Sequence, residues 1–393
     1  MRIEKGYELT FARADDASLS LVEFGEYLFD SLILFAPQTS RLGGGVGVDD
    51  IMEFVRSGRS VVLAGSSDMG EPMRELAAEC GIEFDEQDSY VLDHVGYDAS
   101  DADGDHSLLV ADAFGDDAKV VVGAAGVAAP VLFRGIGHAI LASGEDDDGV
   151  HLEVLVGSDF AYSHVPSSPV EEIPLTVGST TGLVSAVQAR NNARLAITGS
   201  LEMFSNAFLQ ASVARASGTV KPVKSGNKDF VLGLTSWVFG ERNLLRIAET
   251  AHFKADDASK SPLGTYRVKD DIEFHAVIQE WDGSAWIPYQ TDDIQLEFQM
   301  LDPYVRLTMP HDGAGNYVAA FKVPDVYGVF QFKLNYRRHG YSSLSLAEQV
   351  SIRPFRHNEF PRMLVQAYPY YVSAFSSLGC FVLFSFVFLH HRE

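Results

Sequence analysis

The chain has 393 residues, 46% of them hydrophobic, and a formal net charge of −24. This length predicts two or three domains, and the apolar fraction is enough to fill their cores, which excludes a wholly disordered chain. Residues 1–150 contain 9 basic and 30 acidic residues, a net charge of 9 − 30 = −21, which disfavours nucleic-acid binding. The two cysteines, Cys80 and Cys380, cannot form a disulfide framework or a zinc site.

Strands and helices are expected to alternate from residue 7 to about residue 216, a pattern typical of an α/β domain with an open, mainly parallel sheet. Short apolar runs predict its strands, and amphipathic stretches that stop at glycines predict its helices. The expected strands are Tyr7–Phe11, Ser31–Ala36, Ser60–Ala64, Ser107–Ala111, Lys119–Val122, Leu183–Val187 and Leu195–Thr198. The expected helices are Asp49–Ser57, Pro72–Cys80 and Leu201–Ala216.

After a further helix around Phe230–Phe239, the hydrophobic period changes to two. Such alternation predicts half-buried antiparallel strands and a β-sandwich next to the membrane. The expected strands are Ile272–Glu280, Ile294–Met300, Tyr317–Val323, Phe330–Tyr336 and Leu346–Ile352. The resulting domain limits are 1–220 for the α/β domain, 221–262 for a helical linker region and 263–356 for the sandwich-like domain.

The C-terminal segment is the clearest single feature. No formally charged side chain occurs from Met363 to His391, and Tyr370–Leu389 is an apolar run of 20 residues. A helix of that length crosses a hydrocarbon core of about 30 Å, and tyrosines at its start are typical of a membrane interface. We expect a transmembrane helix over 368–389, with residues 390–393 as the tail.

Small residues within this span form a candidate packing surface. Ser373 and Ser377 are four residues apart, as are Ser376 and Cys380, and Gly379 is adjacent to Cys380. We expect these positions to share one side of the helix, where small residues allow close approach of another helix in lipid. The alternative is that they face lipid.

Two loops after predicted strands are candidates for ligand contact. The glycine-rich segment 41–50 lacks the spacing of a phosphate-binding motif and ends in two aspartates, so we interpret it as a flexible connector. Gly65–Gly70 resembles a nucleophile elbow but lacks its second glycine. Because it lies at the carboxyl edge of the sheet, Ser66, Ser67 and Asp68 are candidate ligand-binding residues, although helix capping also explains them.

Other possible sites are weaker. Asp98, Asp101, Asp103 and Asp105 lack the acids that a calcium-binding loop needs at its first and last positions, which favours a solvated acidic turn. Cys80 lies on the apolar face of its helix, as an inert buried thiol does. The sequence therefore predicts no catalytic residues, no metal site and no cofactor.

Several segments are similar to the family of 48-kDa subunits of the oligosaccharyltransferase complex, in order and from end to end. They are Ala14-Asp-Asp-Ala-Ser-Leu-Ser-Leu21, Ser66-Ser-Asp-Met-Gly-Glu-Pro72, Glu79-Cys-Gly-Ile-Glu-Phe-Asp-Glu86, Gln188-Ala-Arg-Asn-Asn-Ala-Arg194, Gly199-Ser-Leu201, Asp292-Asp-Ile-Gln-Leu-Glu-Phe298, Pro324-Asp-Val-Tyr-Gly-Val-Phe-Gln-Phe-Lys333 and Ala367-Tyr-Pro-Tyr-Tyr371. The acidic loops near 99–105 and 145–149 depart from that pattern. Met1–Lys5, followed by Gly6, is typical of the last turn of a helix, and we expect that the family's signal peptide, first strand and first helix of a Rossmann-like domain are missing.

The resemblance implies a non-catalytic accessory subunit of a complex that moves a preassembled glycan from dolichyl pyrophosphate to Asn in Asn-x-Ser/Thr. Its implied partners are the other subunits, including a polytopic catalytic subunit, and the lipid bilayer, with the glycan or dolichol-linked donor as a further contact. It also implies a single-pass type I protein of the endoplasmic reticulum membrane with a luminal large domain and a cytosolic tail.

Two alternatives stay open. Arg353, Arg356 and Arg362 precede the span and Arg392 follows it, so the positive-inside rule alone predicts a tail-anchored cytosolic scaffold. An amidotransferase-like α/β enzyme that binds a small ligand would use the Gly65–Gly70 loop.

Overall fold

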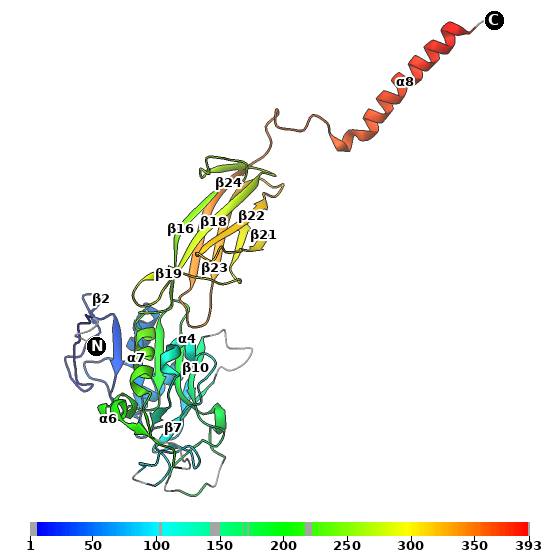
Figure 1. Ribbon diagram of the computed structural model, residues 1–393. Helices are drawn as coiled ribbons and strands as arrows, with labels where there is room; N and C mark the ends of the chain where they lie inside the picture. Colours follow the sequence, from blue (N-terminus) through cyan, green and yellow to red (C-terminus); the bar gives the residue numbers. More distant parts are fainter. Residues whose placement is uncertain are drawn as a thin grey trace.

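The computed structural model describes residues 6–101, 104–141, 150–166, 168–170, 173–216 and 222–391. An α/β unit, a β-sandwich and a long C-terminal helix follow one another along the chain (Figure 1). The predicted fold class is therefore confirmed. Met1–Lys5, predicted as the end of a helix, and the acidic segment 145–149 lie outside the described residues.

A seven-stranded sheet forms the centre of the α/β unit. Its neighbouring strands are, in order, β3 (Ser31–Leu34), β4 (Ser60–Ala64), β13 (Arg194–Thr198), β12 (Gly182–Gln188), β9 (His138–Ile140) and β5 (Ile82–Phe84), and β12 also pairs with β10 (His151–Val156). β3, β4 and β13 are parallel, whereas the other pairs are antiparallel. The direction changes at β12 and β13 because the short turn 189–193 joins them, with Asn192 at a φ of 68°. The sheet is thus mixed, with its parallel part on the side of β3.

Helices cover both faces of this sheet. They are α2 (Val48–Arg56) and α3 (Glu71–Glu79) on one face, and α4 (Ala118–Val121), α5 (Gly123–Gly126) and α7 (Asn227–Val238) on the other. Successive side chains of a strand point to opposite faces. Accordingly, Val61 and Leu63 of β4 belong to the core with α2 and α3, and Val62 belongs to the core with α7.

Three local predictions are wrong. Lys119–Val122 lies in α4 and its C-cap instead of a strand, because a short apolar run does not distinguish a buried strand from a buried helix. The predicted helix Leu201–Ala216 is broken at Ser205, whose extended backbone separates η2 (Glu202–Phe204) from α6 (Asn206–Gln210). Tyr7–Phe11 contains no strand.

Short elements surround the main sheet. Four two-stranded pairs are β1 (Val22–Glu23) with β2 (Glu26–Tyr27), β6 (Tyr90–Leu92) with β11 (Tyr162–His164), β7 (Leu109–Ala111) with β8 (Val131–Phe133), and β14 (Ser212–Val213) with β15 (Val223–Lys224); η1 spans Gly178–Thr180. The strand predicted at Ser107–Ala111 therefore exists as β7, but it pairs with β8 outside the main sheet.

Two sheets pack face to face in the second unit. One contains β16 (Leu244–Lys254), β18 (Asp271–Trp281), β19 (Trp286–Pro288) and β22 (Asn316–Lys322), and the other contains β17 (Thr265–Arg267), β24 (Leu344–Arg353), β23 (Gly328–Tyr336), β20 (Gln295–Gln299) and β21 (Pro303–Thr308). Phe274 and Ile278 from the first sheet meet Phe298, Phe330 and Phe332 from the second in one buried core. The alternating pattern in the sequence is the origin of this packing.

The segment expected as a helical linker, 221–262, is divided between the two units. Its helix, α7, packs into the core of the α/β unit through Phe230, Leu234 and Trp237. β16 follows after only five residues and pairs with the whole length of β18. The chain therefore passes from one unit to the other without an extended connection.

A buried arginine joins the two units. Arg194, at the start of β13, is 2% exposed and donates hydrogen bonds to the carbonyl oxygens of Trp237 (2.8 Å), Arg242 (2.9 Å) and Asn243 (2.9 Å). Burial, with a smaller contribution from the charge of Arg242, lowers the pKa of Arg194 to about 10. Trp237 Nε1 donates to the carbonyl oxygen of Gly340, in the turn between β23 and β24 (2.8 Å). The guanidinium and Trp237 thus bind backbone carbonyls of both units.

Two neighbouring side chains extend this junction. Gln188 Nε2 donates to the carbonyl oxygen of Tyr341 (2.6 Å), and Asn192 Oδ1 accepts from the backbone nitrogen of Ser343 (2.8 Å). Together with Trp237 of α7, the segment Gln188–Arg194 holds the sandwich against the α/β unit.

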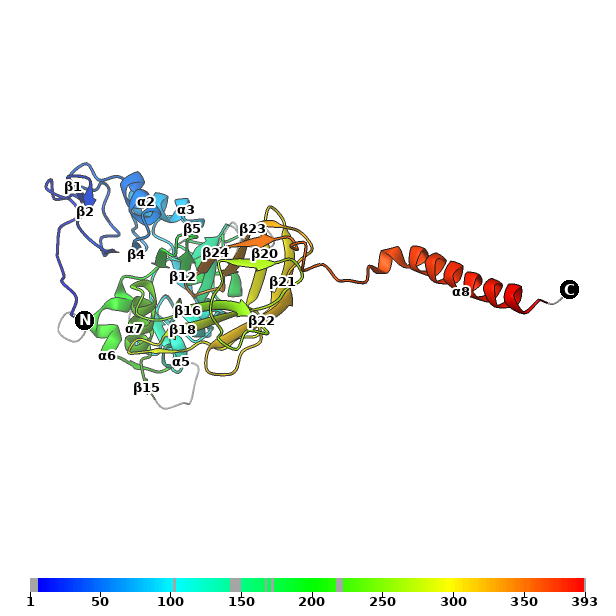
Figure 2. The same cartoon turned by 90° about the horizontal axis from the view of Figure 1, so that it is seen from above.

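The last helix, α8 (Tyr368–His390), extends away from the folded units (Figure 2). Val365–His390 contains an 18-residue stretch with a mean hydropathy of 2.1, and none of that stretch is buried. A core helix would be buried, and a signal sequence would lie near the N-terminus. α8 is about 35 Å long, enough to cross a bilayer core, so we interpret it as a membrane-spanning helix.

Candidate functional site

An open pocket of about 1010 Å³ lies at the carboxyl ends of β3 and β4. Its walls come from segments 12–15, 35–41 and 66–68, with Tyr90 and Arg134 on a further side. Parallel strands end at the same edge of a sheet, which is why the turns after β3 and β4 meet there. The three residues predicted to contact a ligand, Ser66, Ser67 and Asp68, all line this pocket.

Asp68 is the centre of a small polar network. Its two carboxylate oxygens accept hydrogen bonds from Ser66 Oγ and from Gln38 Nε2, which belongs to the turn after β3. Ser67 is only 8% exposed, and its carbonyl oxygen accepts from the backbone nitrogen of Asp88 (2.8 Å). Ser67 therefore supports the turn, whereas Ser66, Asp68 and Gln38 present polar groups to the pocket.

The pocket combines aromatic and charged side chains in near balance. Phe35 is 46% exposed and packs on Phe204, with ring centroids 4.9 Å apart. Three arginines and four acidic side chains share the lining, namely Arg13, Arg41, Arg134, Asp15, Asp68, Asp88 and Glu202. Arg13 and Asp15 form an ion pair of 2.9 Å. A lining with such a mixture of charges, hydrogen-bonding groups and an aromatic face fits a neutral polar ligand better than a polyphosphate.

The polar groups at this edge of the pocket are bonded to one another. The hydroxyl of Ser66 donates to the carboxylate of Asp68, which also accepts from Gln38 Nε2. Across the described ranges of the chain, no group of three or more His, Cys, Asp or Glu side chains is arranged to hold a metal ion. The arrangement can bind and orient a ligand through hydrogen bonds.

The glycine-rich loop before α2 forms part of the pocket's frame. A Cβ atom at Gly43 would lie 2.1 Å from the carbonyl oxygen of Asp16, and one at Gly44 would lie 1.8 Å from that of Leu19. Asp50 accepts from the backbone nitrogen of Gly47 (2.7 Å) and so caps α2 from within. Close packing, more than the flexibility that we predicted, explains these glycines.

The other sequence candidates have structural contacts. Asp98 Oδ2 accepts from the backbone nitrogen of Ala214 (2.8 Å), and Asp101 Oδ2 accepts from that of His106 (2.8 Å); Asp103 lies outside the described residues. Burial raises the pKa of the Cys80 thiol to about 12, which keeps it protonated and unreactive.

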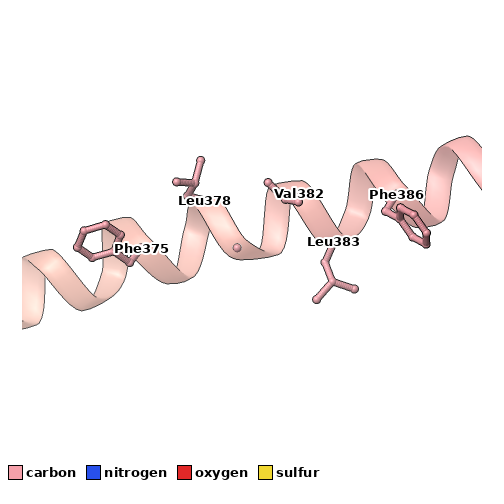
Figure 3. Close-up of a pocket in the computed structure, with 6 residues that line it drawn as sticks. Phe375, Leu378, Val382, Leu383 and Phe386 are labelled. Atoms are coloured by element: carbon pink, nitrogen blue, oxygen red, sulfur yellow. The ribbon is translucent and has the colours of Figure 1, made fainter.

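The small residues of α8 divide between two sides of the helix. A turn of 3.6 residues places Ser373, Ser377 and Cys380 together, with Ser376 beside them. Gly379 lies instead in a hollow on another side, which is lined by Phe375, Leu378, Val382, Leu383 and Phe386 (Figure 3). Gly379 is the neighbour of Ser376 around the helix, three residues further along, and the packing surface of the five small residues stays a prediction.

The hydroxyls of Ser373, Ser376 and Ser377 are satisfied within the helix. Ser373 Oγ donates to the carbonyl oxygen of Tyr370 (2.9 Å), and Ser376 and Ser377 donate to that of Ser373 (3.0 and 2.8 Å). This bonding lowers the cost of placing a hydroxyl in lipid.

Comparison with known proteins decides the family. The model of the OST48 N-terminal domain matches residues 3–241, and that of the OST48 middle domain matches residues 252–392. The chain belongs to the OST48 family. Relatives named dolichyl-diphosphooligosaccharide–protein glycosyltransferase 48 kDa subunit come from Arabidopsis thaliana (43% identity over 389 residues), Danio rerio (43% over 392) and Drosophila melanogaster (41% over 394). The alignments cover 99% of this chain and 86–87% of each relative.

The sequence prediction missed part of the OST48 pocket. Gln38 and Phe35 follow β3, whose strand was predicted, and the rule for parallel strands assigns their turn to the same edge as Ser66. That rule could have found them. Arg134 follows β8, a short strand outside the main sheet, and nothing in its sequence neighbourhood indicated this placement.

Proposed function

We propose that this chain is a membrane-anchored, non-catalytic subunit of an oligosaccharyltransferase, a dolichyl-diphosphooligosaccharide–protein glycosyltransferase that acts in protein N-glycosylation. The observation that carries the proposal is identity of 41–43% across 99% of the chain to 48 kDa subunits of that name. A separate polytopic subunit performs the chemistry, and this chain assembles with it and with the other subunits.

Complementation tests this role. A tagged copy is expressed in cells depleted of their own 48 kDa subunit, and glycosylation of a reporter with Asn-x-Ser/Thr sites is measured. We expect restored glycosylation and co-purification with transferase activity. A chain that is stable and membrane-bound, yet purifies without transferase activity and leaves the reporter under-glycosylated, would contradict the proposal.

The non-catalytic role has its own test. Ser67→Ala in the assembled complex should leave glycan transfer within a few-fold, because Ser67 supports a turn. A loss beyond about a hundredfold with intact assembly, the scale of removing a catalytic group, would instead favour an enzyme of the amidotransferase-like class.

We also propose that the folded units lie in the lumen of the endoplasmic reticulum and that residues 390–393 are cytosolic. This orientation is what the resemblance to the 48-kDa subunit family implies, whereas Arg353, Arg356 and Arg362 favour the opposite one by charge alone. Protease added to intact microsomes should leave the units undigested until detergent is added. Digestion without detergent would favour the cytosolic scaffold.

The pocket at β3 and β4 is proposed to contact the glycan of the dolichol-linked donor. Its support is the exposed ring of Phe35 next to Gln38, Ser66 and Asp68, since a sugar ring offers an apolar face and several hydroxyl groups. Saturation-transfer NMR of the full chain in detergent should detect a neutral oligosaccharide at concentrations where inorganic pyrophosphate does not compete. Equal displacement by pyrophosphate would point to the charged part of the donor.

The serine side of α8 is proposed as a packing surface for other subunits. Because small residues allow close helix approach, Ser377→Ile and Ser376→Ile should reduce recovery of partner subunits in mild detergent about fivefold or more. Gly379→Ile is the matched comparison on another side of the helix. Unchanged recovery with both serine variants would leave α8 as a simple anchor.

A further inference from the structure

The end of the β-sandwich that faces away from the α/β unit carries exposed apolar side chains. Leu301, in the turn between β20 and β21, is 90% exposed, and Tyr327, in the turn before β23, is 68% exposed. Tyr304 and Val329 are also exposed there, and Tyr304 packs on the buried Phe330 with ring centroids 5.3 Å apart. We call Leu301, Tyr304, Tyr327 and Val329 the distal patch.

The distal patch lies at the point where the chain leaves for the membrane. Gly328 pairs with Ile352 and Val329 with Ser351, so β23 begins beside the last residues of β24. β24 ends at Arg353 and leads to α8. The opposite end of the sandwich is occupied by the junction with the α/β unit (Figure 1). The end with the distal patch is therefore the one directed toward the bilayer.

The connection between β24 and α8 is shorter than its sequence implies. Arg353 donates to both carboxylate oxygens of Glu359 (2.6 and 2.8 Å), and this ion pair lowers the pKa of Glu359 to about 2. The guanidinium carbon of Arg267 lies 5.1 Å from the centroid of the Phe355 ring. Residues 353–359 are thereby held on the sandwich, and residues 360–367 alone span the remaining distance to α8.

The last three of these residues form the short 3-10 helix η3 (Val365–Ala367), and even a fully flexible chain of eight residues would have a root-mean-square length of only about 15 Å. This tether keeps the distal patch within reach of the headgroup layer wherever α8 crosses the bilayer. The tether is mainly apolar but contains Arg362, and Phe360, Met363 and Val365 are 53%, 64% and 82% exposed. Tyr368 and Tyr370 at the start of α8 belong at the membrane interface.

The charge at this end does not oppose contact with lipid. Two carboxylates there are paired with cations, in Lys254–Asp270 (2.6 Å) and Lys269–Asp325 (2.8 Å), while Asp302 follows Leu301 directly in the chain. Residues 1–150, by contrast, carry −21 and would be repelled by anionic headgroups. Tyrosine and leucine next to basic side chains suit the boundary between headgroups and acyl chains.

We propose that the distal patch rests on the surface of the same bilayer that α8 spans, with Leu301 and Tyr327 inserted at the level of the upper acyl chains. The sandwich then stands on the membrane through two contacts, the helix and the patch, which fixes its tilt. This inference rests on α8 spanning the bilayer and is independent of which side the folded units occupy.

Tryptophan depth measurement tests the proposal on the full chain in proteoliposomes. Leu301→Trp and Tyr327→Trp replace exposed residues, so both variants are expected to fold. Thr308→Trp is the matched control, exposed at the other end of β21. Trp237, Trp281 and Trp286 give the same background in every variant.

With phospholipids brominated near the top of the acyl chains, quenching of Leu301→Trp and Tyr327→Trp should exceed that of Thr308→Trp by about twofold or more. Equal quenching in the three variants would overturn the proposal. A blue shift of Leu301→Trp that appears only in the assembled complex, without bromine quenching, would also overturn it and would assign the patch to a protein partner.

Discussion

Two polar regions of the α/β unit lie at opposite ends of the same parallel strands and are organised in opposite ways. At the starting end of β13, Arg194 is buried, and backbone carbonyls surround its guanidinium. At the finishing end of β4, Ser66, Asp68 and Gln38 bond to one another at the edge of an open pocket. One edge of the sheet holds the sandwich, and the edge where α/β sheets bind ligands stays open.

The difference shows how burial decides what a polar side chain contributes. A buried charge must have its partners, and losing them costs several kcal/mol, whereas partly exposed groups can exchange their partners for water at little cost. We therefore expect substitutions at the junction to change stability and substitutions in the pocket to change binding.

The largest effect is expected from Arg194→Met. It removes the guanidinium's hydrogen bonds to the carbonyls of Trp237, Arg242 and Asn243. The carbonyls of Trp237 and Asn243 keep a second donor, the backbone nitrogens of Gly240 and Ser342 (3.1 Å each), so the unfolding free energy should fall by about 2 to 4 kcal/mol. Denaturant unfolding of the full chain in detergent measures it. Arg56→Met, which removes an exposed ion pair, is the control. An equal effect of the two substitutions would contradict the conclusion that burial makes Arg194 important for stability.

Gly43→Ala, in the glycine-rich loop before α2, should lower stability more than substitutions of the polar side chains that line the pocket. The added Cβ atom would lie 2.1 Å from the carbonyl oxygen of Asp16, and a backbone clash cannot be relieved by a rotamer change, so we expect a loss of about 2 to 3 kcal/mol. Gly264→Ala has no atom within 4 Å and should be neutral in the same unfolding measurement. Similar stabilities of the two variants would mean that the loop moves aside.

The buried His138 should make stability depend on pH. Burial lowers its pKa to about 3, and its Nε2 lies 2.7 Å from Ser185 Oγ. Because the pKa is about 6.5 in the unfolded chain, the stabilisation is present above pH 6.5 and is lost as the pH falls, by about 2 kcal/mol between pH 7 and pH 5. His138→Gln should remove this decrease of the unfolding free energy between pH 7 and pH 5, whereas the variant His357→Gln, at an exposed position, should keep it. A slope unchanged by His138→Gln would refute the assignment.

Gln38→Ala should give the smallest change in stability. Its partner Asp68 can be hydrated instead, so the unfolding free energy should change by less than about 0.5 kcal/mol. Binding of a neutral oligosaccharide should nevertheless weaken about five- to tenfold, as loss of one hydrogen bond implies. Gln87→Ala, in an exposed turn, controls both measurements. A large loss of stability with unchanged binding would reverse the roles of the two regions.

Much of the architecture follows from hydrophobic periodicity. β4, β12, β13 and β23 match predicted strands because each is a strongly apolar or strictly alternating run. The run Lys119–Val122 was assigned wrongly because four residues carry no usable period. β16 was not predicted, because a β-bulge between Ile247 and Glu249 interrupts its alternation.

The candidate site was predictable in position and less so in detail. The edge containing Ser66, Ser67 and Asp68 follows from topology alone, whereas the bond from Gln38 to Asp68 depends on the shape of two turns. The role of Arg194 could not be predicted, because its partners are backbone carbonyls, which every residue has. Its sequence neighbourhood indicated only a family-like motif.

The junction also sets an order of events during synthesis. Arg194 reaches across 146 positions to the carbonyl oxygen of Gly340, so the ribosome adds that many residues before this acceptor exists. At translation rates of about 5 to 20 residues per second, the delay is on the order of 10 to 30 s. During that interval the guanidinium of Arg194 lacks this acceptor, so the junction closes only after the turn between β23 and β24 has been synthesised.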